Sequence, residues 1–523
     1  MSGNHSYRPV YHASVPSGWS NDPNGLIYYN GKAHLFFQHY PYKPEWGTMH
    51  WGHLVTEDLV HWEALPVAIR PDRDYEVLCG CCSGSSIEKD GRLYLLYTAA
   101  QPELQRQCLA VSHDGGITFE KEKSNPILTA EMLSQEVSPL DFRDPRLFEK
   151  DGWFYFIAGA RVLEPEQAVF RTARGSGSGT PKPVSVWPED RPLRSPSAGD
   201  VSGSEQEREG FGNLILCRSR DLYRWEYVGH LLHPQPEFDS AFFALNGVYE
   251  CPDYLELNGR EVLLSSPQNL PQMGNLYQNI HSGLYMLGRL DFDSGRFSID
   301  RIGEVDSGFD FYAAQTLRMP DGRAVMIAWK EMWDRNYPTQ EEGWAGTYSF
   351  PREITVEAGR LIQKPARELD AFCKNEVSCA LLSVCDGEAS VQGVEGTVIR
   401  LRFTLAPGTA ERAGVRLFAG KTHETLLYFD RRENAIVIDR SRSGLPLRGR
   451  EENVNVRRCE VGSAGEIALE LLLDVSSLEV FIEGGSHAMT ANVYPDPEDR
   501  EIRFFAEGGR AAFRDILKYD VIV

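Results

Sequence analysis

The stretch NGKAHLFFQHY, residues 30–40, decides the fold. It joins an Asn-Gly pair, which forms tight hairpin turns because both residues tolerate positive φ, to an apolar and aromatic run typical of a β-strand. Four other stretches repeat this arrangement: DGRLYLLYTAA (90–100), DGWFYFIAGA (151–160), NGREVLLSSPQ (258–268) and DGRAVMIAWKE (321–331). The chain therefore carries one hairpin signal five times.

The spacing of these turns indicates one repeated structural unit. The intervals between the turn glycines are 60, 61, 107 and 63 residues, counted along Gly31, Gly91, Gly152, Gly259 and Gly322. The long interval contains residues 171–210, where 18 of 40 residues are Gly, Pro or Ser. That composition is typical of a flexible insertion that cannot build a core. Without the insertion the interval returns to about 60 residues.

Five hairpin units of this size predict an all-β fold that begins with a five-bladed β-propeller over residues 1–355. A long β-sandwich with chance turns is the alternative. Residues 376–523 alternate short apolar runs, such as TVIRLRFTL and EIRFFAEGG, with turn residues, which predicts a C-terminal β-sandwich. We expect residues 356–375 to form a linker, partly helical because KPARELDAF (364–372) has a helix-like composition.

The composition argues against several classes of partner and site. The net charge is −21, whereas nucleic acids and anionic membranes require basic patches. No stretch has the length of a membrane-spanning helix and the N-terminus has no apolar signal region, so we expect a cytoplasmic protein. The ten cysteines cluster tightly only in LCGCCSG (78–84), with no second group to complete a zinc site. We expect reduced thiols, no metal and no cofactor; the oligomeric state is not indicated.

Acidic residues occupy related positions in three of the five units. In a propeller the innermost strand of each blade lines the central channel, so residues at the same distance before the turn glycine come together. Asp22 and Glu250 lie nine positions before their glycines, and Asp144 lies eight before. Ser83 takes this place in the second unit, and the fifth unit offers Tyr312, Ala313 and Ala314, with Gln315 next. Three carboxylates on one axis repel each other, which favours a functional site; turn capping by Asp before Pro is the alternative.

Three acids without a metal suit glycoside hydrolysis. That reaction needs one carboxyl group as nucleophile or base and another as acid. A third carboxyl group can bind sugar hydroxyls, and aromatic rings near the first acid, such as Trp19, can stack on the sugar. We expect the turn amides of Asn24 and Gly25, together with Arg143, to keep Asp22 ionised.

The motifs around the acids resemble those of a known family. WSNDPNG (19–25), FRDP (142–145) and ECPD (250–253), in this order, resemble the three signature motifs of glycoside hydrolase family 32. LFFQHYPYKPEWGTMHWGH, GFDFYAAQTL, WDRNYPTQEEGWAGTYSFPREI and DVSSLEVFIEGG resemble further segments of that family. CSGSS resembles another, with Cys82 where Phe is usual. The insertion at 171–210 departs from the family.

The resemblance implies a five-bladed propeller joined to a jelly-roll-like sandwich. It implies that Asp22 is the nucleophile, that Glu250 is the general acid/base, and that Asp144 binds fructose hydroxyls and stabilises the transition state. The implied substrate-binding residues are Trp19, Asn21, Gln38, Trp46, Cys82, Ser83, Arg143 and Trp333.

The resemblance also implies an activity. It is that of a retaining hydrolase of terminal β-D-fructofuranosides, acting on sucrose or sucrose 6-phosphate through a covalent fructosyl-enzyme. The alternatives are an exo-acting fructan or fructooligosaccharide hydrolase, a fructosyltransferase, and a sugar-binding propeller without activity. Lys43 and Arg335 are candidate ligands for a substrate phosphate.

Overall fold

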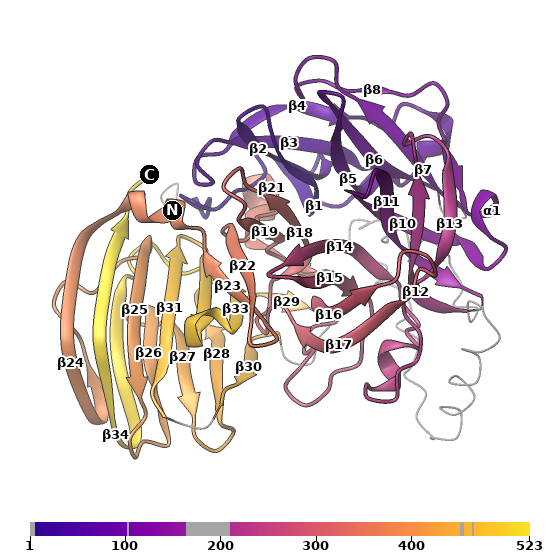
Figure 1. Ribbon diagram of the computed structural model, residues 1–523. Coiled ribbons are helices and arrows are strands. Elements are labelled where there is room, and N and C mark those ends of the chain that lie inside the picture. The colour runs from indigo at the N-terminus through magenta and orange to yellow at the C-terminus, as the bar shows by residue number, and fades with distance from the viewer. Residues whose placement is uncertain (1–5, 102–103, 164–209, 450–453, 463–464) are drawn as a thin grey trace.

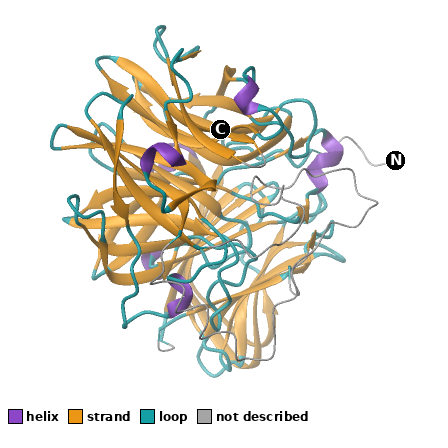
Figure 2. Ribbon diagram, turned by 90° about the vertical axis from the view of Figure 1, so that its right-hand side faces the viewer, coloured by secondary structure: helices purple, strands orange, loops and turns teal. Residues whose placement is uncertain are grey.

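The computed structural model describes residues 6–101, 104–163, 210–449, 454–462 and 465–523. Strands make up nearly all of its regular structure, and the helices are short (Figure 2). Five sheets surround a common axis in the first part of the chain, and a larger sheet follows them (Figure 1). The insertion predicted at 171–210 lies, except for Gly210, outside the described residues.

The five-bladed propeller is confirmed by the order of its strands. Each blade begins with an inner strand that pairs with the next strand of its own hairpin, and the inner strands of neighbouring blades contact each other around a closed ring. The inner strands are β1 (Gly18–Tyr29), β5 (Gly80–Lys89), β10 (Val137–Lys150), β14 (Tyr249–Leu257) and β18 (Tyr312–Arg318). Residues far apart in sequence therefore meet where these strands begin.

The remaining blade strands follow in antiparallel order outward from the axis. They are β2 (Lys32–Tyr40), β3 (His50–Thr56) and β4 (Glu63–Ile69) in the first blade; β6 (Arg92–Gln101), β7 (Leu104–Val111), β8 (Glu120–Lys121) and β9 (Leu128–Thr129) in the second; β11 (Trp153–Val162), β12 (Phe211–Ser219) and β13 (Trp225–His230) in the third; β15 (Arg260–Pro267), β16 (Leu284–Leu290) and β17 (Phe297–Glu304) in the fourth; and β19 (Ala324–Trp329), β22 (Arg352–Glu357) and β23 (Arg360–Pro365) in the fifth. The short strand β21 (Trp344–Ala345) comes from the fifth unit but pairs in parallel with β1, so it joins the last blade to the first.

The helical segments are single turns between strands. They are the α-helix α1 (Ala130–Leu133) and the 3₁₀ turns η1 (Asp74–Glu76), η2 (Ser240–Phe242), η3 (Pro338–Glu342), η4 (Arg367–Phe372) and η5 (Glu483–Gly485). No helix within the described ranges is both long and apolar enough to cross a membrane.

Four of the five predicted turns have the expected backbone. Both central residues have positive φ in Asn30-Gly31, Asp90-Gly91, Asp151-Gly152 and Asn258-Gly259. The fifth turn is longer: only Gly322 is left-handed, and the Met319 N–H donates to the Arg323 carbonyl. A further two-residue turn with positive φ, Ala358-Gly359, joins β22 to β23.

The fifth blade extends further along the chain than we expected. Strands β22 and β23 complete its sheet and end at Pro365, so the expected boundary at residue 355 is too early. The turn between these strands has Ala at its first position, and it therefore lacks the Asn-Gly or Asp-Gly signal that marks the other hairpins. The predicted linker, 356–375, begins within this blade and holds one 3₁₀ turn, η4, before the C-terminal sheet starts at Cys373.

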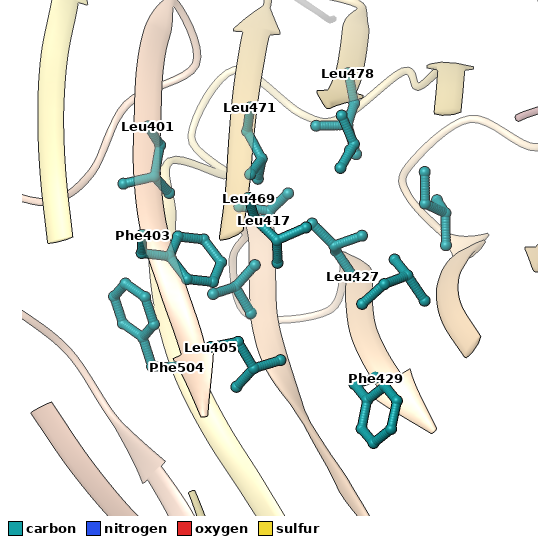
Figure 3. Close-up of a cluster of buried hydrophobic side chains, with 14 of the residues drawn as sticks. Leu401, Phe403, Leu405, Leu417, Leu427, Phe429, Leu469, Leu471, Leu478 and Phe504 are labelled. Atoms are coloured by element: carbon teal, nitrogen blue, oxygen red, sulfur yellow. The ribbon is translucent and has the colours of Figure 1, made fainter. Parts of the chain in front are cut away.

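The C-terminal sheet folds over on itself as a sandwich. Its long last strand pairs with β25 through its second half and with β26 through its first half, so two groups of strands face each other. Leu401 and Leu471 from one group and Leu417 and Leu427 from the other share one buried core (Figure 3). The strands are β24 (Cys373–Ala389), β25 (Ile399–Ala406), β26 (Arg412–Ala419), β27 (Glu424–Asp430), β28 (Ala435–Arg442), β30 (Val456–Glu460), β31 (Ile467–Asp474), β32 (Ser477–Ile482), β33 (His487–Asn492) and β34 (Glu501–Val521), while β20 (Arg335–Asn336) pairs with β29 (Arg448–Gly449).

Candidate active site

Every inner strand is interrupted by a β-bulge close to its start. The pairing is irregular between Ser20 and Pro23, Cys82 and Gly84, Arg143 and Arg146, Glu250 and Asp253, and Tyr312 and Gln315. A bulge bends its strand and changes the direction of its side chains, and bulges are frequent beside active sites. The left-handed backbone of Asp144 (φ 62°), Cys251 (φ 46°) and Ala313 (φ 55°) marks three of these bulges.

The three acids do not occupy one equivalent position. Asp22 and Asp144 lie within bulges, whereas Glu250 is the last paired residue before one. In the third blade the equivalent of Glu250 is Arg143, and in the fourth the equivalent of Asp144 is Cys251. The expectation of one shared position is wrong because a slip of one residue turns a side chain to the other face of a strand.

The Asp22 carboxylate is held by side chains from two other blades. The Ser83 hydroxyl of β5 donates a hydrogen bond to Asp22 Oδ2 at 2.7 Å. The Cys251 thiol of β14 donates to the same oxygen at 3.5 Å. Asp22 is 9% exposed, and its carboxylate is largely buried.

Cys251 joins the first acid to the second. Its backbone N–H donates to Asp144 Oδ2 at 3.1 Å, and its thiol lies 3.7 Å from the same oxygen. The backbone N–H of Asp144 in turn donates to the Thr98 hydroxyl at 3.0 Å, which fixes the bulge against the second blade. Asp22 and Asp144 therefore flank one sulfur atom.

Glu250 is bound by an arginine and a tyrosine. Arg143 donates from Nε to Glu250 Oε1 at 3.0 Å and places Nη2 2.9 Å from the same oxygen. The Tyr312 hydroxyl donates to Oε2 at 2.6 Å. Arg143, which we expected to favour the charged form of Asp22, is instead engaged by Glu250 and Asp141.

Burial, together with the charge of the neighbouring acids, raises the pKa of Asp22 and Asp144. Burial raises the pKa of Asp22 to about 6, and the negative charge of Glu250 adds to the rise, while the hydrogen bond from Ser83 opposes it. Burial raises the pKa of Asp144 to about 7 against the opposing charge of Arg143, with Glu250 and Asp22 adding to the rise. At neutral pH Asp22 is therefore mostly ionised.

Aromatic side chains pack beside the acids. Trp19, Trp46, Cys82 and Trp333 belong to one apolar cluster with Tyr312, whose hydroxyl binds Glu250. The Trp19 ring centroid lies 6.1 Å from that of Trp333. The structure thus brings together the aromatic residues and Cys82 that the sequence indicated as substrate-binding.

The other predicted residues have more varied surroundings. Asn21 accepts a hydrogen bond from the Trp19 indole at 2.8 Å, and Gln38 donates to the Cys81 carbonyl rather than to an acid. Arg335 is buried and pairs with Asp310 at 2.5 Å, so it is unsuited to a substrate phosphate. Lys43, the other candidate, has an exposed side chain that pairs with Glu45.

Three functional neighbours were not predicted as site residues. Cys251 lies inside the ECPD motif, but a thiol gave no reason to expect contact with two acids. Tyr312 was one of three adjacent candidates for this place in the fifth unit, none of them acidic. Asp141, two residues before Arg143, had no signal, because its second partner, Arg161, comes from the next strand.

The arrangement combines three acids: Asp22, which is mostly ionised at neutral pH, Glu250, which Arg143 binds, and Asp144, which shares the Cys251 thiol with Asp22. This set can attack a sugar carbon, transfer a proton to a leaving oxygen, and bind hydroxyl groups. Among the described residues, the side chains close enough to hold a metal ion are His423, Asp496 and Asp499, none of which belongs to this group.

Comparisons with known proteins agree along the whole chain. The family model for the glycosyl hydrolases family 32 N-terminal domain matches residues 12–174 and 201–365, and the model for the family 32 C terminal matches residues 371–520. A sucrose-6-phosphate hydrolase of Zymomonas mobilis is 34% identical, over 98% of this chain and 91% of the relative. A raffinose invertase of Escherichia coli is 30% identical, over 98% of this chain and 94% of the relative.

Solved structures share the fold. A sucrose-6-phosphate hydrolase from Lactobacillus gasseri superposes with a TM-score of 0.78 at 27% identity, covering 98% of this chain and 93% of that one. A GH32 β-fructofuranosidase from Bombyx mori gives a TM-score of 0.72 at 28% identity, covering 99% and 94%. With both family models matched and the three motif acids gathered from separate blades, the chain belongs to glycoside hydrolase family 32.

Proposed function

We propose that this glycoside hydrolase cleaves terminal β-D-fructofuranosides with retention, and that its substrate is sucrose or sucrose 6-phosphate. One observation carries the proposal: Cys251 contacts both Asp22 and Asp144, while the adjacent Glu250 is held at the same place by Arg143. The relatives named for sucrose-6-phosphate hydrolysis support the choice of substrate. A cytoplasmic location stays a prediction that suits a small imported sugar.

In the first step Asp22 is the nucleophile. One carboxylate oxygen forms a bond to the anomeric carbon of the fructosyl group as the bond from that carbon to the leaving sugar oxygen breaks. Glu250 gives its proton to that oxygen, so the sugar leaves as a neutral alcohol. The products are the free sugar, a covalent fructosyl ester on Asp22, and the Glu250 carboxylate.

In the second step water displaces the Asp22 carboxylate from the fructosyl group. Glu250 accepts a proton from water while the water oxygen attacks the anomeric carbon, and the bond to Asp22 breaks. Fructose is released with its original configuration, and both carboxyl groups return to their starting states. Two carboxyl groups about 5–5.5 Å apart suit this two-step course.

The remaining side chains bind the fructosyl group. We assign hydroxyl binding and stabilisation of the positive ring to Asp144, helped by Arg143. We assign apolar contacts to Trp46, Trp333 and Cys82, the last of which is smaller than the usual Phe, while the fully buried Trp19 packs against Trp333. Asn21, Gln38 and Ser83 complete the assigned subsite.

Fructose release from sucrose, sucrose 6-phosphate and inulin tests the proposal. We expect hydrolysis of at least one of the first two at a kcat/KM about tenfold or more above that for inulin. Asp22→Asn should lower kcat by about four orders of magnitude without changing the circular dichroism spectrum. A preference for inulin would favour the exo-acting fructan hydrolase, and no release from any fructoside would favour a sugar-binding propeller.

A further inference from the structure

Arg143 binds two acids directly and lies close to a third, since its Nε is 4.0 Å from Asp144 Oδ2. Its Nε and Nη2 face Glu250, while Nη1 donates to Asp141 Oδ1 at 2.9 Å. Nη2 also donates to the Gln268 side-chain oxygen at 3.2 Å. Arg143 is 3% exposed, and Asp141 is fully buried. Asp141 therefore anchors the arginine on the side away from Glu250.

A second arginine, Arg161, binds Asp141 on the side away from Arg143. The other carboxylate oxygen accepts a hydrogen bond from Arg161 Nε at 2.9 Å. Arg161, on β11, donates to the Gly210 carbonyl at 3.3 Å and to the Asn246 carbonyl at 3.1 Å. This chain of contacts fixes the Asp141 carboxyl group between two buried arginines.

We infer that Asp141 is a positioning residue for the proton-donating step: it orients Arg143 against Glu250 and compensates the arginine's charge, so that Glu250 can carry the proton that the leaving sugar needs. The inference rests on the proposed function, because it assigns Glu250 as the acid. Asp141 does not contact Glu250. Because it lies behind Arg143, it does not contact the reacting atoms either.

The physical reason is the competition for one positive charge. An arginine that faced only Glu250 would strongly favour its carboxylate form, which cannot protonate a leaving group. Asp141 accepts a hydrogen bond from Arg143 Nη1 and so draws part of that interaction away. The other titratable groups that interact with Glu250 are Asp22, Asp144, Cys251 and Tyr312.

A purely structural role for Asp141 makes a different prediction. The ion pair with Arg161 joins β10 to β11, so the loss of the carboxylate lowers stability in either case. Only the positioning role ties Asp141 to acid catalysis. Substrates that differ in their need for a proton separate the two roles.

The test compares sucrose with p-nitrophenyl β-D-fructofuranoside, whose nitrophenolate leaves without a proton. In Asp141→Asn we expect kcat/KM for sucrose to fall about tenfold to a hundredfold and that for the aryl fructoside by less than about threefold. The upper pH limb for sucrose should move down by about one pH unit. Both values are taken on one preparation, so partial unfolding cancels in their ratio.

Asp253→Asn is the matched control. Asp253 is equally buried, pairs with Arg146 at 2.8 Å, and lies on the next inner strand. Asp253→Asn should keep the wild-type ratio of kcat/KM for sucrose to kcat/KM for the aryl fructoside. Asp141→Glu should restore most of the ratio that Asp141→Asn loses. An unchanged ratio and pH limb in Asp141→Asn would overturn the inference, whereas wild-type protein inactive on both substrates would refute the proposed function itself.

Discussion

At the scale of single residues, the site holds more negative charge than a folded interior favours. Asp22 and Asp144 are buried near Glu250, and burial raises the pKa of both. The bulges hold Asp144 and Cys251 in left-handed conformations that few L-residues adopt. The geometry that brings these groups to one sugar therefore lowers the stability of the fold.

The raised pKa of Asp22 sets an acid limit on activity. Below about pH 6 Asp22 takes up a proton and loses its nucleophilic form. We expect kcat/KM for sucrose to fall about tenfold for each pH unit below that value. Ser83→Ala removes a donor to the carboxylate and should move this limb to higher pH. Rate profiles between pH 4 and 8 measure both effects, and an acid limb that stayed in place in the Ser83 variant would contradict this assignment.

The same raised pKa gives a prediction for stability. Between about pH 4 and 6 the native protein keeps the Asp22 proton that the unfolded chain has released, so the free energy of unfolding falls as the pH rises through this window. Asp22→Asn removes the charge and should raise the free energy of unfolding at pH 7 by on the order of 1–3 kcal/mol. Urea denaturation at pH 7 and pH 4 measures the gain, which should vanish at pH 4.

A surface acid provides the control for this gain. Glu226 is exposed and pairs with Arg218 at 3.0 Å, so Glu226→Gln should leave the free energy of unfolding within about 1 kcal/mol of wild type. If Asp22→Asn were only as stable as wild type at pH 7, burial of the charged Asp22 carboxylate would not lower the free energy of unfolding.

At the scale of elements, the sequence predicted turns better than bulges. Asn-Gly and Asp-Gly pairs mark four hairpins because few other residues accept both positive φ values. The bulges have no such mark: Cys251 and Ala313 adopt the unusual backbone without being Gly or Asn. The acids were found because charge is visible in a sequence, whereas the contacts of Asp141 with Arg143 and Arg161 depend on how two strands align.

The hairpin turn Ala358-Gly359, which has no Asn-Gly or Asp-Gly signal, can be stabilised by a substitution. Ala358 has φ 49° at the first central position of the hairpin β22–β23, where Asn is preferred because its side chain tolerates the left-handed region. We expect Ala358→Asn to raise the free energy of unfolding by about 0.5–1 kcal/mol. Thermal melting measures it, with Asp151→Ala, at the equivalent place in the third blade, as the converse variant. A lower melting temperature for Ala358→Asn would contradict this account of the turn.

At the scale of the whole molecule, buried ion pairs join the propeller to the sandwich. We call the side chains of His12, Asp306, Arg352, Asp474 and Glu479 the interface network. Arg352 Nη2 lies 2.6 Å from Glu479 Oε2, and its Nη1 lies 3.0 Å from Asp306 Oδ2. His12 Nδ1 lies 2.8 Å from Asp474 Oδ2, and its Nε2 lies 3.0 Å from Glu479 Oε1. All five residues are buried, so separating the propeller from the sandwich would break these contacts.

Glu479 tests this coupling because its charge is central to the network. Burial alone would raise the pKa of Glu479, but Arg352 and His12 outweigh it and hold the pKa at about 2. The stabilisation is therefore complete above about pH 4.5 and is lost as the pH falls toward 2. Glu479→Gln leaves Arg352 with an unmatched charge and should lower the free energy of unfolding at pH 7 by about 3–5 kcal/mol, with a smaller difference near pH 3.

Two optical probes, one for the propeller and one for the whole chain, distinguish joint from separate unfolding in that experiment. All ten tryptophans precede residue 345, so their fluorescence follows the propeller, while far-ultraviolet circular dichroism follows strands throughout the chain. Because the network spans the contact, we expect both denaturation curves of Glu479→Gln to shift together to lower urea. A fluorescence curve that stayed at the wild-type midpoint while the dichroism shifted would mean that the sandwich unfolds alone and that the network does not bind the two parts into one cooperative unit.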